Sequence, residues 1–282
     1  MRTPRFVPSG CLLAAFFLSC GWLPLRAGDW QLVWRDEFNR AGAPDPANWT
    51  YEEGFVRNQE LQFYTRDRRE NARVENGLLV IEARHESFPN PAFQQGARGW
   101  QRARPNAEFT SACLITRKLH AWKYGRIEVR AKLPQGKGVW PAIWMMGDAR
   151  GPEAWPACGE IDVMEFVAHD ARKIHANVHW AKPGTQREHQ SAGGNMTNDT
   201  LHSGFHDYGV EWDERTLAIT FDGKPYFRFD MDRAGKGPDN PFRQPCYLLI
   251  NLAVGGTWGR EADPAAYPQR FEIDWVRVYR KW

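Results

Sequence analysis

Three acidic residues fall within six positions of a stretch that is otherwise apolar. They are Glu160, Asp162 and Glu165, in the segment Glu-Ile-Asp-Val-Met-Glu. Aspartate is depleted in strands, and a carboxylate that faces an apolar core must be paired or neutralised. Two carboxyl groups held close together can divide the work of proton donor and nucleophile. The segment is therefore the first candidate for a catalytic site, and the alternative is an edge strand whose acids face water.

The spacing of these acids decides which face of a strand they occupy. Strict alternation places Glu160 and Asp162 on one face and Glu165 on the other. One extra residue, a β-bulge around Val163 and Met164, returns Glu165 to the face of the other two, and such bulges are frequent beside active sites. Residues two apart on one face have Cα atoms about 6.5–7 Å apart. The carboxyl groups of Glu160 and Glu165 can then approach the separation of about 5–5.5 Å that retaining glycosidases use.

Two histidines lie further along the chain. His175 and His179 are four residues apart, which on a helix would bring them together as zinc ligands. Val178 and Trp180 favour a strand instead, and no third ligand motif follows. A metallohydrolase that uses both histidines with the acids stays an alternative, and so does a histidine that simply packs in the core.

The elements that must position these residues are short strands. Arg126–Lys132 and Leu217–Phe221 alternate polar and apolar side chains, and Asp222-Gly223 is typical of a hairpin turn before a strand at Pro225–Phe229. Further strands are expected at Leu78–Ala83, Phe109–Thr116, Val139–Met146, Glu160–Val167, Lys173–Trp180, His206–Trp212, Tyr247–Val254 and Phe271–Tyr279. No helical pattern of ten or more residues is found. The pattern predicts an all-β fold, a two-sheet antiparallel sandwich.

Two long polar segments interrupt these strands. Residues 86–108 carry Arg98, Arg102 and Arg104, and residues 185–200 carry Gly193-Gly194. Both are predicted to be loops, which on a β scaffold either bind ligands or are mobile. We expect the arginines to face solvent, and a grip on an anionic substrate is the alternative.

Composition excludes several classes of protein. The 282 residues are 42% hydrophobic and include 14 Trp, too apolar and aromatic for disorder, and no internal stretch is long enough to span a bilayer. Residues 1–27 have a basic start, a short apolar run and Leu-Arg-Ala before Gly28, which predicts a signal peptide and a secreted or periplasmic protein; lipoprotein anchoring at Cys20 is the weaker alternative. Residues 28–282 are expected to form one domain, in which the 37 Lys and Arg fall by three to equal the 34 Asp and Glu. A neutral domain is not expected to bind nucleic acid.

Three cysteines remain in that domain, Cys113, Cys158 and Cys246. One disulfide is possible with one thiol left over, but for Cys158 a small buried side chain is the favoured interpretation.

Around the acidic segment the chain resembles glycoside hydrolase family 16, and within it the laminarinase-like bacterial endo-β-1,3-glucanases. The acidic segment itself has the extra residue that is typical of laminarinases. Six further stretches and the chain's last strand carry the resemblance in order: Trp34–Phe38, Asn58–Thr65, Tyr124–Pro134, Trp140–Met146, His206–Trp212, Asn251–Trp258 and Asp274–Tyr279. The resemblance implies a jelly-roll, concanavalin A-like sandwich with a substrate cleft on its concave sheet.

The resemblance also assigns roles. It makes Glu160 the nucleophile and Glu165 the general acid/base, with Asp162 assisting between them and His179 contacting the cluster. It places the substrate-binding side chains at Asn58, Glu60, Trp140, Trp144, Trp155 and Trp258. Aromatic faces suit sugar rings, although Trp144 could equally be core, and Trp34, Trp212 and Trp275 are expected to be core.

The resemblance implies that hydrolysis needs no cofactor and that a structural calcium lies far from the cleft, at Glu37, the Gly77 carbonyl and Asp274. Oxygen ligands suit calcium, and ordinary surface acids are the alternative. The expected substrate is a β-1,3-glucan or mixed-linkage β-1,3-1,4-glucan, cleaved by a monomer. The alternatives are a related activity on agar- or carrageenan-type galactans and a β-glucan-binding sandwich without catalysis.

Overall fold

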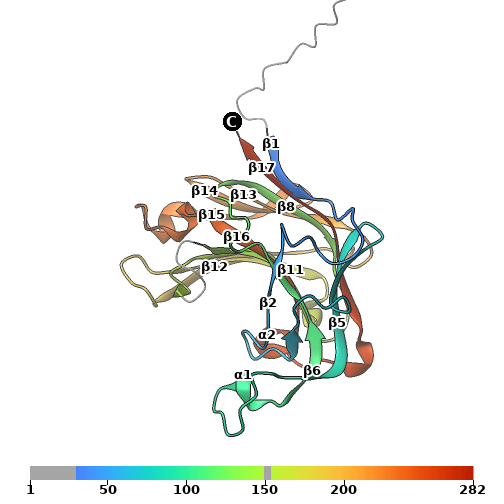
Figure 1. Cartoon of the computed structure of the whole chain (residues 1–282). Coiled ribbons are helices and arrows are strands. Elements are labelled where there is room, and N and C mark those ends of the chain that lie inside the picture. Colours follow the sequence, from blue (N-terminus) through green and yellow to red (C-terminus); the bar gives the residue numbers. More distant parts are fainter. Residues whose placement is uncertain (1–29, 149–153, 282) are drawn as a thin grey trace, which may run out of the picture.

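Two β-sheets packed face to face make up the protein, as the computed structural model in Figure 1 shows. The structure describes residues 30–148 and 154–281. The expected signal peptide, residues 1–27, lies outside these residues and stays a prediction. Within the described residues no helix is long and apolar enough to cross a membrane.

The first sheet has ten strands, in the order β15-β14-β13-β8-β17-β5-β6-β3, with β1 added on β17 and β4 on β5. Their bounds are β1 (Trp30–Asp36), β3 (Gln62–Tyr64), β4 (Ala72–Glu75), β5 (Leu78–Pro89), β6 (Asn106–Ser111), β8 (Gly125–Lys132), β13 (His206–Trp212), β14 (Thr216–Phe221), β15 (Lys224–Asp230) and β17 (Gln269–Lys281). All pairs in it are antiparallel except β3 with β6, which is parallel.

The second sheet has seven strands, in the order β12-β11-β10-β9-β16-β7-β2. Their bounds are β2 (Thr50–Glu52), β7 (Cys113–Ile115), β9 (Val139–Gly147), β10 (Glu160–Phe166), β11 (Lys173–Ala181), β12 (His189–Thr197) and β16 (Cys246–Val254). The helices are short: α1 (Trp100–Ala103), α2 (Gly256–Gly259) and single 3₁₀ turns. The two-sheet all-β prediction is confirmed.

The core between the sheets follows from alternation along each strand. On β11, Ile174, Ala176 and Val178 are fully buried in the main core cluster. Burial of a large aliphatic side chain is worth about 1.5–3 kcal/mol, so this face of the strand is firmly fixed. The alternate residues, His175, Asn177 and His179, must then point out of the sandwich on the far face of the seven-stranded sheet. We call that outer surface the cleft face.

Strand β10 contains the expected bulge. Its pairing with β9 shifts between Asp162 and Met164, and its pairing with β11 shifts between Asp162 and Glu165. Both Val163 and Met164 are buried in the core, so one residue is inserted on that side. Glu160, Asp162 and Glu165 therefore all stand opposite cleft-face residues of β11, namely His179, Asn177 and His175.

The prediction that residues 185–200 form a loop was wrong, because they contain β12. This strand has few of the β-branched and aromatic residues that mark strands. A glycine is required at its centre, since a Cβ on Gly193 would lie 2.1 Å from the Asn177 Oδ1 atom. Close packing against β11 explains the composition of β12, and such packing leaves no periodic pattern in the sequence.

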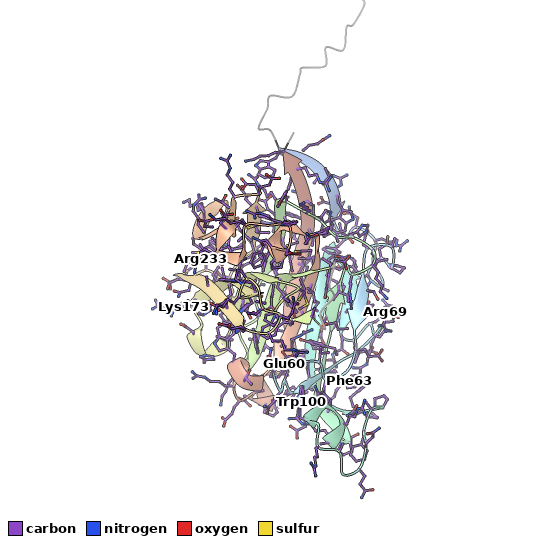
Figure 2. The ribbon with its side chains drawn as sticks, turned by 90° about the vertical axis from the view of Figure 1, so that its left-hand side faces the viewer. Glu60, Phe63, Arg69, Trp100, Lys173 and Arg233 are labelled. Atoms are coloured by element: carbon purple, nitrogen blue, oxygen red, sulfur yellow. The ribbon has the colours of Figure 1, made fainter. Side chains whose placement is uncertain are left out.

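Residues 86–108 were also only partly a loop, because β5 extends to Pro89 and β6 begins at Asn106. Between them, α1 projects from the end of the molecule (Figure 2), and its Trp100 packs against Phe55 and Phe63. The guanidinium of Arg104 stacks on Phe55 and Trp100 there rather than facing solvent alone. The three cysteines are buried, and none of them is bonded to another. Of the three tryptophans assigned to the core, Trp212 is buried, Trp34 packs against the core, and Trp275 is half-buried under Arg277.

Candidate active site

The three acids of β10 line one hollow on the cleft face of the seven-stranded sheet. Its other walls come from the loop after β2 and from strands β9 and β16. The residues that line it are Arg57, Asn58, Glu60, Trp140, Ala142, Trp144, Glu160, Asp162, Glu165, Asn251 and Ala253. The bulge thus does what the spacing argument requires, because it brings all three carboxyl groups to one cavity.

Glu165 is half-buried and held by two donors from neighbouring strands. Its carboxyl group accepts hydrogen bonds of 3.1 Å from Trp140 Nε1 on β9 and of 3.1 Å from Asn177 Nδ2 on β11. Burial, and next the charge of Glu160, raise the pKa of Glu165 to about 7, while the two hydrogen bonds act in the opposite direction. Glu165 is therefore able to carry a proton near neutral pH.

Glu160 lies at the other end of the acidic row and is also half-buried. Its Oε2 atom accepts a 2.7 Å hydrogen bond from the indole of Trp155. The Trp155 side chain is 41% exposed, so a large aromatic surface stands beside this carboxylate. An exposed ring next to a partly open carboxylate is an arrangement that suits a sugar unit resting above Glu160.

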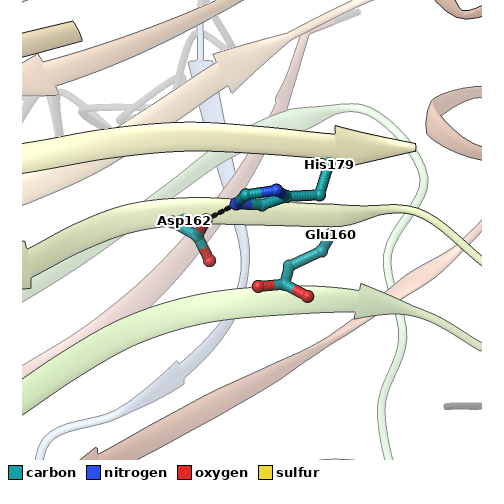
Figure 3. A group of neighbouring side chains, drawn as sticks. All are labelled: Glu160, Asp162 and His179. Atoms are coloured by element: carbon teal, nitrogen blue, oxygen red, sulfur yellow. Dashed lines mark ion pairs between the residues drawn. The ribbon is translucent and has the colours of Figure 1, made fainter. Parts of the chain in front are cut away.

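Asp162 lies between the two glutamates along β10. It faces His179 of β11, as Figure 3 shows. Its Oδ2 atom is 3.2 Å from His179 Nε2. Burial first, and then the charges of Glu160 and Glu165, raise the pKa of Asp162, while burial lowers that of His179. Burial thus favours the uncharged form of both groups.

Comparison with known proteins places this geometry in a family. Residues 59–277 match the family model described as glycosyl hydrolases family 16. The chain belongs to that family. It is 40% identical to a β-glucanase of Rhodothermus marinus, over 99% of this chain and 97% of the relative.

Two solved structures resemble this family 16 hydrolase closely. The laminarinase of Rhodothermus marinus superposes with a TM-score of 0.77 at 42% identity, covering 90% of this chain and 98% of the other. A structure reported with endo-acting O-glycanases that human gut bacteria use to initiate mucin breakdown gives a TM-score of 0.84 at 37% identity, covering 92% of each chain. The jelly-roll fold is thus shared with known family 16 hydrolases.

The other expected substrate contacts lie around the hollow in different ways. Glu60 is buried and accepts hydrogen bonds from Gln62 at 2.7 Å and from Asn58 at 3.3 Å. Trp258 packs edge-on against Trp140, with ring centroids 5.4 Å apart. Four of the six expected contact residues line the hollow itself: Asn58, Glu60, Trp140 and Trp144.

Trp144 is placed differently from a sugar-stacking platform. Its Nε1 donates a 2.7 Å hydrogen bond to Asn251, and the guanidinium of Arg57 lies over its ring at 4.8 Å from the centroid. Arg57 is itself bound to the carboxylate of Glu52. The residue is only 5% exposed, so Trp144 packs as part of the cleft floor.

The residues at the site that were not predicted from the sequence include Asn177, Arg57 and His189. Asn177 had a usable signal, because it lies two positions before His179 and shares its face of a strand. Arg57 and His189 had none, since they reach the site from a distant loop and from the strand mistaken for a loop.

The metal alternatives fit less well. Single atoms of Glu160, Asp162 and His179 lie within 4.8 Å of one another, which is the geometry of a possible cation group. His175 does not join them, because its ring packs against Trp258 at 4.9 Å. The zinc interpretation, which needs both histidines, therefore fails on this geometry.

The expected calcium ligands are engaged elsewhere. Both carboxylate oxygens of Glu37 accept hydrogen bonds from Arg277, at 2.8 and 2.9 Å. Asp274 pairs with Arg130 at 3.3 Å in a more exposed contact. The Glu37 side chain does not fit a calcium ligand in this arrangement, whereas the Asp274 pair is weak enough to be displaced.

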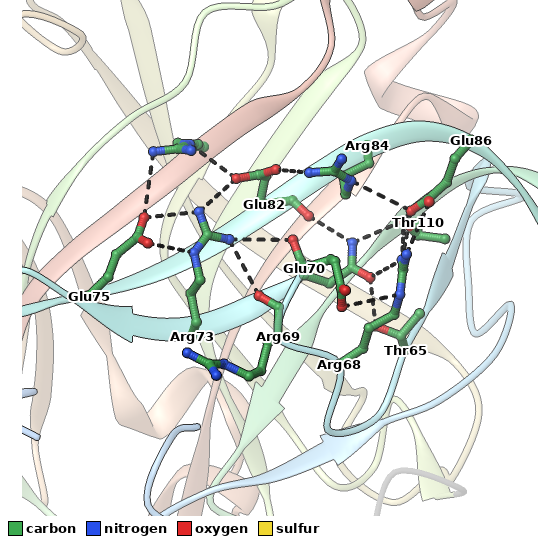
Figure 4. Close-up of polar contacts among 12 residues, drawn as sticks. Thr65, Arg68, Arg69, Glu70, Arg73, Glu75, Glu82, Arg84, Glu86 and Thr110 are labelled. Carbon is green, nitrogen blue, oxygen red and sulfur yellow. Dashed lines mark hydrogen bonds and ion pairs between the residues drawn. The ribbon is translucent and has the colours of Figure 1, made fainter. Parts of the chain in front are cut away.

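A second cluster of charges, on the ten-stranded sheet, is a structural one. Glu82 is buried and bound by Arg73, Arg84 and Arg270, and Arg73 also holds Glu75 (Figure 4). Each of these carboxylates is paired with at least one arginine, so the cluster offers no unpaired acid for chemistry.

We expect Asn177→Leu to change the pH dependence of hydrolysis. The amide of Asn177 donates to Glu165 and lowers its pKa, so removing it raises the pKa further above its usual range. A general acid works only while protonated, so activity falls as pH rises through this pKa. The descending limb of kcat/KM should therefore move to higher pH, by about half to one unit.

Measuring kcat/KM from pH 4 to 9 checks this. Asn195→Leu, at an exposed position of the neighbouring strand β12, is the control and should leave the limb in place. A limb that stays fixed or moves to lower pH in Asn177→Leu would show that Glu165 is not the group whose proton is lost.

Proposed function

We propose that this family 16 hydrolase is a retaining endo-β-glucanase that cleaves β-1,3-glucan of the laminarin type or mixed-linkage β-1,3-1,4-glucan. The observation that carries the proposal is the bulge of β10, which places two glutamates of unlike environment in one hollow. Relatives named β-glucanase and laminarinase, at 40% and 42% identity over nearly their whole length, support the choice of substrate.

The proposed reaction has two displacements. Glu165 gives its proton to the oxygen of the leaving sugar while the Glu160 carboxylate attacks the anomeric carbon, so the glycosidic bond breaks and a glycosyl ester forms. Glu165, now ionised, takes a proton from water as that water attacks the same carbon and releases Glu160. The raised pKa of Glu165, about 7, suits a group that must both give and take this proton.

Asp162 separates the two glutamates and has its own part. Its pKa is raised by burial and by the charges of both glutamates, so Asp162 takes up a proton more readily than an ordinary aspartate. A protonated Asp162 donates a hydrogen bond to a carboxylate beside it, and so stabilises negative charge on Glu160 before attack and after ester cleavage. His179, 3.2 Å away, completes its surroundings.

A galactan- or mucin-type glycan is the second candidate. It is favoured by the likeness to the structure reported with mucin O-glycanases, at a TM-score of 0.84. The arginines of residues 98–104 lend it little support, because none of them lines the hollow that holds the acids, and Arg104 is stacked on aromatic rings.

The proposed place of action is outside the cytoplasm. Support comes from the basic start and short apolar run of residues 1–27. Intact-mass analysis of the processed protein should give a chain that begins at Gly28. A chain that begins at a lipid-modified Cys20 would instead establish the anchored alternative.

We also propose a structural calcium that uses Asp274 and backbone oxygens at Gly77 and Glu37, with no part in the chemistry. A chelator should then lower the melting temperature by about 5–10 °C, the effect of losing an ion present at about 100 times its dissociation constant. The initial rate at 25 °C should not change. Asp274→Asn should already melt at the lower temperature and be insensitive to the chelator, whereas insensitivity of the unmodified protein would exclude the ion.

The decisive experiment compares hydrolysis of laminarin, lichenan, agarose, xyloglucan and mucin glycoprotein by the unmodified protein and by Glu160→Gln. We expect activity on the first two substrates, with β-configured reducing ends in the fresh product by NMR. The amide cannot form the glycosyl ester, so turnover should fall at least about 1,000-fold while laminarin binding persists.

Two outcomes would contradict the double displacement, and two others would select a different function. Turnover that survives in Glu160→Gln would reject the nucleophile, and α-configured products would reject the double displacement. Activity confined to agarose or mucin would select the second candidate. Binding without turnover in the unmodified protein would mean a glucan-binding sandwich.

A further inference from the structure

His189 is an exposed residue at the start of β12, the edge strand of the cleft sheet, and it contacts the site from outside. Its Nε2 atom is 2.9 Å from Nδ1 of His179, and the two rings stack with centroids 5.1 Å apart and planes 19° apart. Its ring also lies 4.9 Å from that of Trp155. One imidazole thus touches both side chains that approach Asp162 and Glu160.

The contact with His189 is the one that orients His179. Asp162 Oδ2 is close to His179 Nε2, at 3.2 Å, yet among the described residues no donor is aligned for a hydrogen bond to that oxygen. The bond from Nδ1 to His189 is well formed. Because the two nitrogens lie on opposite sides of one rigid ring, fixing Nδ1 also fixes where Nε2 points.

The bond between the two histidines also sets the tautomer of His179. When Asp162 is ionised, His179 presents its Nε2–H to it, so His179 Nδ1 must accept from His189 Nε2–H. A protonated Asp162 directs its proton to Glu160, so His179 keeps this tautomer in both protonation states of Asp162.

We propose that His189 is a positioning residue for the acidic row. It holds the ring and tautomer of His179 against Asp162, and it buttresses the Trp155 indole that bonds Glu160. This inference rests on the proposed function for its kinetic consequences, but the arrangement of the two histidines can be tested without substrate.

The charged groups near this pair are few among the described residues. Glu160 and Asp162 face His179 from β10, and Lys182 and Glu188 at the turn before β12 are paired with each other at 2.9 Å. Burial lowers the pKa of His179, the charge of Glu160 opposes this, and His189 adds to the lowering. Replacing the His189 imidazole with a group that carries no charge should therefore raise the pKa of His179.

The test compares His189→Phe, which keeps a flat ring but has no hydrogen bond, with His189→Gln, which keeps a polar group able to bond His179. Gln190→Phe, the next residue along and on the other face of the strand, is the matched control. In His189→Phe we expect kcat on laminarin to fall about 10- to 100-fold with KM little changed, the mark of misplaced catalytic groups. His189→Gln should recover most of kcat.

A second readout does not depend on hydrolysis. In ¹⁵N-histidine NMR, His179 of His189→Phe should titrate at higher pH than in the unmodified protein and lose its single tautomer, and the control should match the unmodified protein. Unchanged kcat and an unchanged His179 titration would overturn the proposal. A raised KM with unchanged kcat would make His189 a sugar contact instead. If no glucan is hydrolysed but the titration moves, only the proposed function fails.

Discussion

Three carboxyl groups on one face of a single strand, partly or wholly removed from water, repel one another when they are ionised, and the whole site is arranged around that conflict. The bulge at Val163 and Met164 creates it, because without the extra residue Glu165 would face the core side. Burial and mutual repulsion then raise the pKa values of Glu165 and Asp162. The proton that catalysis needs is thus retained at neutral pH by the crowding of the acids.

The neighbouring elements supply donors that relieve the crowding unequally. Glu165 receives two hydrogen bonds, from Trp140 on β9 and Asn177 on β11, whereas Glu160 receives one from a loop tryptophan that is open to solvent. The ends of the row consequently differ in the number and the kind of the donors that support them. A division of labour between acid and nucleophile follows from that asymmetry, since identical surroundings would give two equivalent carboxyl groups.

Local patterns in the sequence predicted much of this. Alternation predicted most of the strands, and the spacing of Glu160, Asp162 and Glu165 requires a bulge if the three are to share one face. The errors share one cause. Strand β12 and the cover that Arg57 places over Trp144 depend on contacts between distant segments, and such contacts leave no period in the sequence. The same limit applies to Glu37, whose pairing with Arg277 joins residues far apart in the chain.

The contacts of β12 explain why a segment with little strand pattern in its sequence nonetheless forms a strand. Gly193 lets the backbone lie against the Asn177 amide, and that contact turns the amide nitrogen toward Glu165. On the other side of the strand, a Cβ at Gly194 would lie 3.2 Å from Phe227 of β15, so the ten-stranded sheet supports β12 from beneath. The two glycines thus lie between Asn177, which supports Glu165, and Phe227 of the other sheet. The backbone at Gly193 and Gly194 consequently affects both the orientation of the Asn177 amide toward Glu165 and the packing of the two sheets.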